Sequence, residues 1–255
     1  MFAREGAKLV ITDVDETPAV DVMNEILGQG GQAIAVGGDI TSEGFPEKLI
    51  SETVRVFGPD IDVLVNNAGL SWHAPLHKMT DRQWSRLMDV MVTAPFKIIR
   101  EASPYMRENA IREIANHGAA KCRKIINITS ILGMEGSGAG LINYSAAKAA
   151  LIGLSRSLAK EWGPYNICVN CIAPGMIATR LTDPYPKVIA SRDDKVIVGV
   201  TDRLREAYVN ATPLGRFGTP EDVAKVVLFF ASPLSDFVTD EVLRVAGGLI
   251  TPFGK

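Results

Sequence analysis

The chain has 255 residues, 47% hydrophobic and 22% charged, which is enough to bury the core of one globular domain. The formal net charge is −2 and no basic block is present, which argues against a nucleic-acid partner. No apolar run reaches the roughly 18 residues of a membrane span, and the early charges at Arg4 and Glu5 argue against a signal peptide. We therefore expect one cytoplasmic domain over residues 1–255 and no membrane partner.

Strand-like and helix-like segments alternate along the chain. The expected strands cover residues 8–12, 32–36, 62–66, 124–128, 167–173 and 241–245. The expected helices cover residues 17–27, 46–57, 80–106, 143–162 and 223–231. This alternation predicts an α/β fold, a doubly wound parallel sheet between two helical layers.

Two long connections interrupt the regular pattern. Residues 107–123 are polar and are interpreted as an extended helix end followed by a surface loop. Residues 182–212 follow the strand that ends near Ala173, and we interpret them as a substrate lid, with a passive excursion as the alternative. Met176, Leu181 and Tyr185 would then form an apolar wall of the substrate cavity.

Cysteines and histidines give little sign of a metal or redox site. Cys168 and Cys171 form a C-x-x-C pattern, but within an expected strand they point to opposite faces and are interpreted as inert core thiols. His73 and His77 flank Pro75 with no accompanying ligand pattern, so exposed loop histidines are expected. No metal is predicted.

One trio of residues carries a chemical signal. Tyr144 and Lys148 are four residues apart on an expected helix, so they share a face, and Ser130 ends a β-branched strand upstream. An ammonium beside the phenol would lower the tyrosine pKa from its ordinary value of about 10, which suits proton exchange near neutrality. The trio indicates carbonyl/alcohol redox chemistry, whereas Tyr-x-x-x-Lys alone would be a weak signal.

Other strand ends suit a dinucleotide. Asp13, at the end of the first expected strand, could accept hydrogen bonds from the ribose hydroxyls of an adenosine, although a helix N-cap is an equal alternative. Small residues after the strand at 62–66 would let a ligand approach the backbone. The expected cofactor-binding residues are Asp13, Asp39, Ile40, Asn66, Ala68, Gly69, Tyr144, Lys148, Pro174, Gly175, Ile177 and Thr179.

With these motifs, residues 2–249 resemble the classical short-chain dehydrogenase/reductase family. Among its members, the chain looks most like the 3-oxoacyl-[acyl-carrier-protein] reductase-like group. The resemblance implies a Rossmann-like fold, with Tyr144 as general acid/base, Lys148 lowering its pKa and binding the nicotinamide ribose, and Ser130 binding the substrate oxygen. It also implies a homotetramer or homodimer.

The sequence departs from the family pattern at several places. Met91 stands where the family has a catalytic Asn, and Asp240 and Ala246 replace a Gly and an Asp near the end. In the family, a first strand and a Gly-x-x-x-Gly-x-Gly phosphate loop precede the segment aligned with Met1, and no such loop occurs anywhere in this sequence. We therefore expect a truncated chain that lacks the first strand of the sheet, with weak cofactor binding and poor stability.

The leading hypothesis is a nicotinamide-dependent oxidoreductase that interconverts a ketone and a secondary alcohol, with a 3-oxoacyl thioester among the candidate substrates. NAD is expected over NADP, because Asp13 would repel a 2′-phosphate. The rival is a non-catalytic or fragmentary homologue acting as an interaction or structural protein. A lyase or epimerase using the same Tyr/Lys pair is a third alternative.

Overall fold

The computed structural model describes residues 1–137, 140–183, 187–191 and 194–249. The strands are β1 (Lys8–Ile11), β2 (Gln32–Ala35), β3 (Val63–Asn66), β4 (Arg123–Ile128), β5 (Ile167–Pro174), β6 (Lys187–Ser191), β7 (Asp194–Val198) and β8 (Val242–Val245). The longer helices are α1 (Glu16–Gly28), α2 (Phe45–Phe57), α3 (Asp81–Met88), α4 (Ala94–His117), α6 (Ile142–Trp162), α7 (Asp202–Ala211) and α8 (Pro220–Ala231). The short helical pieces are η1 (Phe2–Glu5), η2 (Leu76–Lys78), η3 (Asp89–Thr93), α5 (Ile131–Glu135), η4 (Gly163–Tyr165), η5 (Arg180–Thr182) and η6 (Pro233–Ser235).

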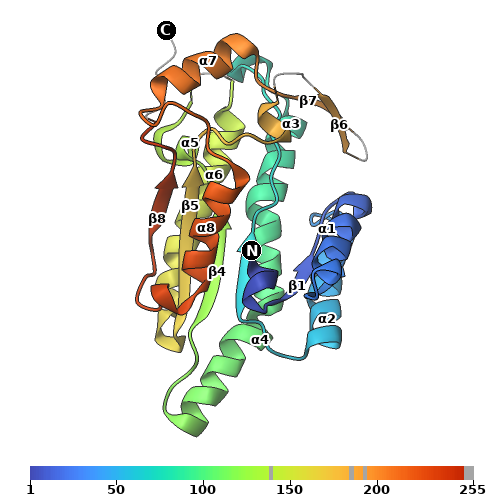
Figure 1. Ribbon diagram of the computed structural model, residues 1–255, viewed down its shortest axis with the longest axis vertical. Coiled ribbons are helices and arrows are strands. Elements are labelled where there is room, and N and C mark those ends of the chain that lie inside the picture. The colour runs from blue at the N-terminus through green and yellow to red at the C-terminus, as the bar shows by residue number, and fades with distance from the viewer. Residues whose placement is uncertain (138–139, 184–186, 192–193, 250–255) are drawn as a thin grey trace.

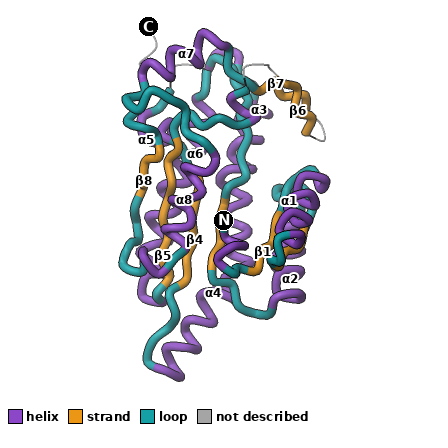
Figure 2. The backbone as a smooth tube through the Cα atoms, viewed as in Figure 1, coloured by secondary structure: helices purple, strands orange, loops and turns teal. Residues whose placement is uncertain are grey.

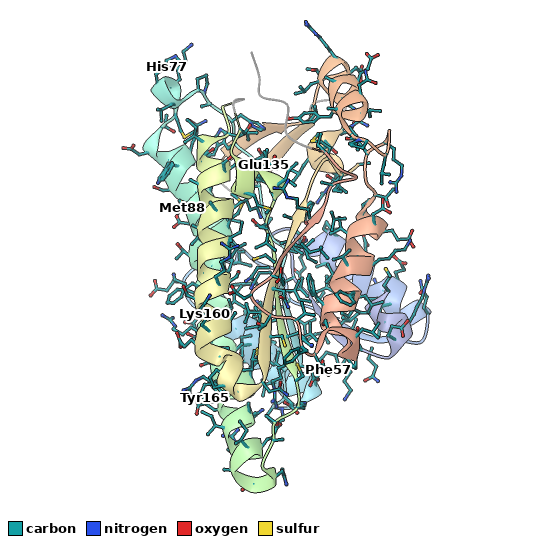
Figure 3. All side chains as sticks on the ribbon, turned by 90° about the vertical axis from the view of Figure 1, so that its left-hand side faces the viewer. Phe57, His77, Met88, Glu135, Lys160 and Tyr165 are labelled. Atoms are coloured by element: carbon teal, nitrogen blue, oxygen red, sulfur yellow. The ribbon has the colours of Figure 1, made fainter. Side chains whose placement is uncertain are left out.

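Four parallel strands form the larger sheet, in the order β3-β4-β5-β8. Every residue of β4 and β5 is buried except Pro174, as expected for apolar runs covered on both faces. Figure 3 shows α6 and α8 on opposite sides of this sheet. On the α8 side, Phe230 packs with Ile126 and Ile172 of the sheet. The predicted three-layer α/β arrangement is therefore confirmed.

The first two strands do not join this sheet. Among the described residues, β1 pairs only with β2 and β3 pairs only with β4, so the chain contains two separate parallel sheets (Figure 2). The edges of β1 and β3 carry no strand partner on their free sides. The strands expected to form one parallel sheet are therefore divided between two.

Side-chain packing holds the β1–β2 unit to the rest of the molecule. Val10 of β1 and Ile34 of β2 pack against a buried cluster that continues through Leu49 of α2 to Ile99 of α4. On the opposite face, Phe2 of η1 packs against the cluster built from β4, β5 and α8. The two sheets thus share a hydrophobic core although they share no hydrogen bonds.

The helix expected over residues 80–106 is present, but it contains a π-helical turn. A capping box between Thr80 and Gln83 opens α3 as predicted, but a π-helical turn, η3, separates α3 from α4. Met91 lies in that turn and is fully buried. A π-helical turn contains one residue more than an α-helical turn, and the hydrophobic periodicity of a sequence does not reveal it. The interpretation of residues 107–123 is confirmed, since α4 runs on to His117.

Two further segments, one at the N-terminus and one after β5, have a regular backbone structure. Residues 2–5 form a 3₁₀ turn that ends at Gly6, whose φ of 83° suits a glycine cap. The region expected as a lid contains an antiparallel pair, β6 and β7, which the sequence analysis did not predict, followed by α7. Tyr185 lies outside the described residues.

None of the helices in the described ranges is long and apolar enough to cross a membrane.

Candidate active site

Ser130 stands where β4 ends and α5 begins. Its backbone is extended, and its Oγ accepts a hydrogen bond from the Leu132 N–H at 3.2 Å, so the serine caps the short helix. The residue is buried. The strand end and the cap together fix this hydroxyl at the carboxyl edge of the sheet, where ligands of α/β folds bind.

Tyr144 and Lys148 lie in the first turns of α6, which Asn143 anchors. The Asn143 Nδ2 donates to the carbonyls of Trp72 at 3.1 Å and Gln83 at 3.2 Å, while its Oδ1 accepts from the Tyr144 N–H at 2.9 Å. Asn143 is fully buried. The sequence alone gives Asn143 no role, because only its position directly before Tyr144 indicates that it could belong to the site.

The structure places the Ser130 hydroxyl near the Tyr144 phenol. Burial nevertheless raises the pKa of the Tyr144 phenol above its ordinary value, and the nearby Ser130 hydroxyl only reduces that rise. This direction is opposite to the lowered pKa expected from the sequence. The physical reason is that desolvation of the phenolate outweighs the stabilisation that its neighbours provide.

Lys148 shares the site but points its ammonium elsewhere. Its Nζ donates to the carbonyl of Ile128 at 2.7 Å and lies 5.8 Å from the centroid of the Tyr144 ring. Burial lowers the pKa of Lys148 to about 8. A charge without an ionic partner in this apolar site is costly, so the lysine releases its proton more readily than a solvated lysine would.

Met91 and Gly69 border the same space. A Cβ added to Gly69 would lie 3.6 Å from the Lys148 Nζ and 3.7 Å from the Met91 Sδ, which are ordinary contacts. The thioether thus occupies the wall beside the lysine where the family has an amide. It offers no strong hydrogen bond to the ammonium.

Helix α5 packs tightly against the catalytic part of α6. A Cβ added to Gly133 would lie 2.8 Å from both the C and the Cβ atoms of Lys148, closer than real atoms approach. In addition, the Thr129 Oγ1 donates to the Lys148 carbonyl at 2.9 Å. These contacts set the position of the lysine backbone relative to Ser130.

Asp13 and Asp39 follow β1 and β2 on the other side of the molecule. Asp13 does not cap α1, because Asp15 does so by accepting from the Thr17 N–H at 3.1 Å. The Asp13 Oδ1 accepts from the Asp15 N–H at 3.0 Å, which leaves its second oxygen for a ligand. Asp39 is bound by Thr41 and by Arg86, and Ile40 beside it is buried.

The remaining expected cofactor residues lie at the ends of β3 and β5. The Asn66 Nδ2 donates to the Asn127 Oδ1 at 2.8 Å, so this amide joins β3 to β4 near their ends. The Gly175 N–H donates to the Val245 carbonyl at 3.0 Å. Ile177 bridges to Gly218, and Thr179 forms a capping box that opens η5. Ala68, Gly69 and Pro174 complete this rim of the sheet.

These residues fit the two ends of a dinucleotide and leave its middle without a partner. The free oxygen of Asp13 suits a ribose, and Gly69, which has no side chain, suits a nicotinamide riboside together with Ser130, Tyr144 and Lys148. Among the described residues, no strand pairs with the free sides of β1 and β3, so no strand-to-helix turn lies between these two strands to bind a pyrophosphate.

Two interpretations of other residue types hold in the structure. Cys168 lies 3.5 Å from Cys122 (Sγ–Sγ), whereas Cys171 donates to the Ser155 Oγ at 3.0 Å, so the two sulfurs of the C-x-x-C pattern diverge. His77 and His73 are both exposed, and no group of three potential metal ligands occurs among the described residues. A cavity of about 480 Å³ lies between His73–Leu76 and the segment before α6.

Comparison with known proteins identifies the family. The sequence model described as enoyl-(acyl carrier protein) reductase matches residues 1–250. The 3-oxoacyl-[acyl-carrier-protein] reductase FabG of Thermotoga maritima is 33% identical over 250 residues, covering 98% of this chain and 90% of that protein. The chain belongs to the short-chain dehydrogenase/reductase family.

Two solved structures show how far the similarity extends. A 7α-hydroxysteroid dehydrogenase complexed with NADH and 7-oxo glycochenodeoxycholic acid has a TM-score of 0.82 at 30% identity, covering 99% of this chain and 88% of that one. A blue fluorescent protein from a metagenomic library, in complex with NADPH, has a TM-score of 0.79 at 30% identity, covering 98% and 90%. The Rossmann-like fold class is thereby confirmed.

Proposed function

We propose that this chain is a nicotinamide-dependent oxidoreductase that interconverts a ketone and a secondary alcohol, with NAD preferred and a 3-oxoacyl thioester as the substrate class. The observation that carries the proposal is that the buried Ser130 lies near Tyr144, with Lys148 buried in the next turn of the same helix. The relative from Thermotoga maritima, a 3-oxoacyl-[acyl-carrier-protein] reductase, supports the substrate class.

Each residue of the trio has a defined task. Ser130 orients the substrate oxygen, and Tyr144 gives that oxygen a proton during reduction or removes it during oxidation. The nicotinamide, when bound, supplies or accepts the hydride. Lys148 turns from the Ile128 carbonyl toward the nicotinamide ribose, and its charge then opposes the effect of burial on the phenol.

The residues around the trio shape the rest of the site. Asn66, Ala68 and Gly69 form one wall of the cofactor site, and the segment through Pro174, Gly175, Ile177 and Thr179 forms the wall facing the carboxamide. Residues 182–212 act as the substrate lid. We also propose that the chain forms a homodimer or homotetramer, and light scattering of the purified protein would test this oligomeric state. The proposed location is the cytoplasm.

The decisive experiment follows NADH oxidation with a 3-oxoacyl thioester, an enoyl thioester and a 7-oxo steroid, using wild type and Tyr144→Phe. We expect the oxoacyl thioester to react and Tyr144→Phe to lower kcat by roughly 10²–10⁴-fold, the usual contribution of a general acid. Near-full turnover by Tyr144→Phe would remove this residue from the mechanism.

The rival hypothesis, a non-catalytic homologue, is disfavoured by the intact trio and by enzymes at similar identity over nearly the whole chain. Calorimetric titration with NADH separates the two. A chain that binds no NADH and turns over no carbonyl would support the rival.

The NAD preference rests on the carboxylate of Asp13. Its second oxygen is free to accept from ribose hydroxyls and would repel a 2′-phosphate. We expect kcat/KM to be higher for NADH than for NADPH and the difference to shrink in Asp13→Ala. A preference for NADPH in wild type, or an unchanged preference in the variant, would contradict this assignment.

A further inference from the structure

Arg86 connects the two sheets of the molecule. It projects from α3, on the catalytic side, to the loop that follows β2. Its Nη2 lies 2.8 Å from the Asp39 Oδ2, and its Nη1 donates to the Thr41 Oγ1 at 2.7 Å. A planar guanidinium that binds two acceptors in this way fixes both in one orientation.

The carboxylate of Asp39 is held from both sides. Its Oδ1 accepts from the Thr41 N–H at 2.9 Å and from the Thr41 Oγ1 at 2.7 Å, while Arg86 occupies one position on Oδ2. Burial alone would raise the pKa of Asp39, but the bonds from Thr41 and Arg86 outweigh it and lower the pKa. A carboxylate accepts about four hydrogen bonds, so Oδ2 keeps one position for a further donor.

The pair is shielded in a way that ordinary surface pairs are not. The side chains of Arg86 and Asp39 are 22% and 15% exposed. By comparison, Arg55 and Glu52 on α2 are 68% and 35% exposed, although their charged atoms are as close. Solvent screens an exposed pair and lets its side chains move, whereas a shielded pair keeps its geometry.

The same helix also contacts the catalytic residues. The Gln83 carbonyl, one turn before Arg86, accepts from the Asn143 Nδ2 at 3.2 Å, and Asn143 binds the Tyr144 N–H. Figure 3 shows Met88, at the end of α3, beside α6, in agreement with the contacts between these helices. Helix α3 therefore holds Asp39 on one side and the start of α6 on the other.

We propose that Arg86 is a positioning residue for the adenosine half of the cofactor: it orients Asp39 so that the free position on Oδ2 accepts the exocyclic amine of adenine. The inference rests on the proposed function, because it requires a nicotinamide dinucleotide. It assigns to Arg86 a role in cofactor affinity and none in proton or hydride transfer.

The test compares NADH with reduced nicotinamide mononucleotide, which lacks the adenosine. In Arg86→Gln, we expect KM and Kd for NADH to rise about tenfold, kcat at saturation to stay within about twofold, and the parameters for the mononucleotide to stay unchanged. Arg86→Lys keeps the charge and should recover part of the NADH affinity. Arg55→Gln, which breaks the exposed pair on α2, is the matched control and should affect neither cofactor.

A double-mutant cycle sharpens the assignment. Asp39→Asn should weaken NADH binding to a similar degree, and Arg86→Gln combined with it should add little further loss. Equal losses with both cofactors would show that Arg86 only supports the fold around α3, and no loss with either would also overturn the proposal. Wild type that binds neither cofactor would instead overturn the proposed function.

Discussion

The catalytic half and the adenosine half of this molecule are built in different ways. The catalytic half consists of β3, β4, β5 and β8 with α5 and α6, and every residue of its central strands β4 and β5 except Pro174 is buried. The adenosine half, β1 and β2 with α1, has a four-residue strand pair whose only buried residue is Ala33. Figure 1 shows this unit standing apart from the larger sheet.

The difference teaches which interactions position each part of the site. Ser130, Tyr144 and Lys148 are held by strand pairing, by the cap of α5 and by buried bonds from Thr129 and Asn143. Asp13 depends on side-chain packing of its unit, and Asp39 depends also on its bonds from Thr41 and its ion pair with Arg86. We therefore expect the chemistry to tolerate damage to the adenosine half better than cofactor affinity does.

The largest expected effect comes from completing the sheet between β1 and β3. Unpaired peptide groups along the two edges each cost about 1–3 kcal/mol where they are buried. One parallel strand followed by a Gly-rich turn, if joined to the chain, would pair with both edges and supply a pyrophosphate site. Residues 1–255 preceded by the strand and turn of a related reductase should bind NADH at least tenfold more tightly and melt at a higher temperature.

The control is the same extension with Pro in the middle of the added strand, which cannot pair on both sides. It should give no gain in affinity or melting temperature. Residues 1–255 that bind NADH with micromolar affinity on their own, and melt as cooperatively as an intact relative, would contradict the comparison between the halves.

Much of the catalytic half could be predicted because its signals are local. The β-branched run before Ser130, the i and i+4 spacing of Tyr144 and Lys148, and the capping box at Thr80 each depend on a few neighbouring residues. Their positions agree with the structure. The ends of the expected strands differ from the observed ends by about one residue, because hydrophobic periodicity does not fix where a strand ends.

What could not be predicted depends on residues far apart in the sequence. The π-helical turn at Met91, the role of Asn143 and the pair between Arg86 and Asp39 arise only when the helices are packed. The expectation that the Tyr144 pKa is lowered was wrong for the same reason. A rule for neighbouring charges on one helix takes no account of how deeply the phenol is buried.

A substitution at Gly133 tests how rigidly the catalytic half is packed. Gly133→Ala would place a methyl group 2.8 Å from the Lys148 backbone and Cβ, so α5 and α6 must separate. We expect a loss of about 1–3 kcal/mol in the free energy of unfolding, as for other overpacked sites, together with a lower kcat. Denaturant unfolding and steady-state kinetics would measure both.

The matched control lies on α6 itself. A Cβ added to Gly153 meets no atom within 4 Å, so Gly153→Ala should stabilise the helix by about 0.5–1 kcal/mol and leave kcat unchanged. If Gly133→Ala behaves like this control, the two helices are less tightly coupled than the comparison requires.

The smallest expected effect concerns the buried charge of Lys148. Its pKa falls from 10.5 to about 8 on folding, because burial disfavours the ammonium. Between these values the unfolded chain binds more protons than the folded one, so the free energy of unfolding rises with pH. From pH 7 to pH 9 this lysine alone should add about 1 kcal/mol to the stability of the cofactor-free protein.

Lys148→Met removes this contribution. The difference in pH dependence between wild type and the variant therefore reports Lys148 alone, because the other titrating groups are present in both proteins. The variant should lose its activity, yet its stability should rise less between pH 7 and pH 9 than that of wild type. Lys160→Met removes an exposed lysine from the same helix and should keep the wild-type slope. Identical slopes in wild type and Lys148→Met would mean that water reaches the ammonium, so the catalytic half would be more open than its packing indicates.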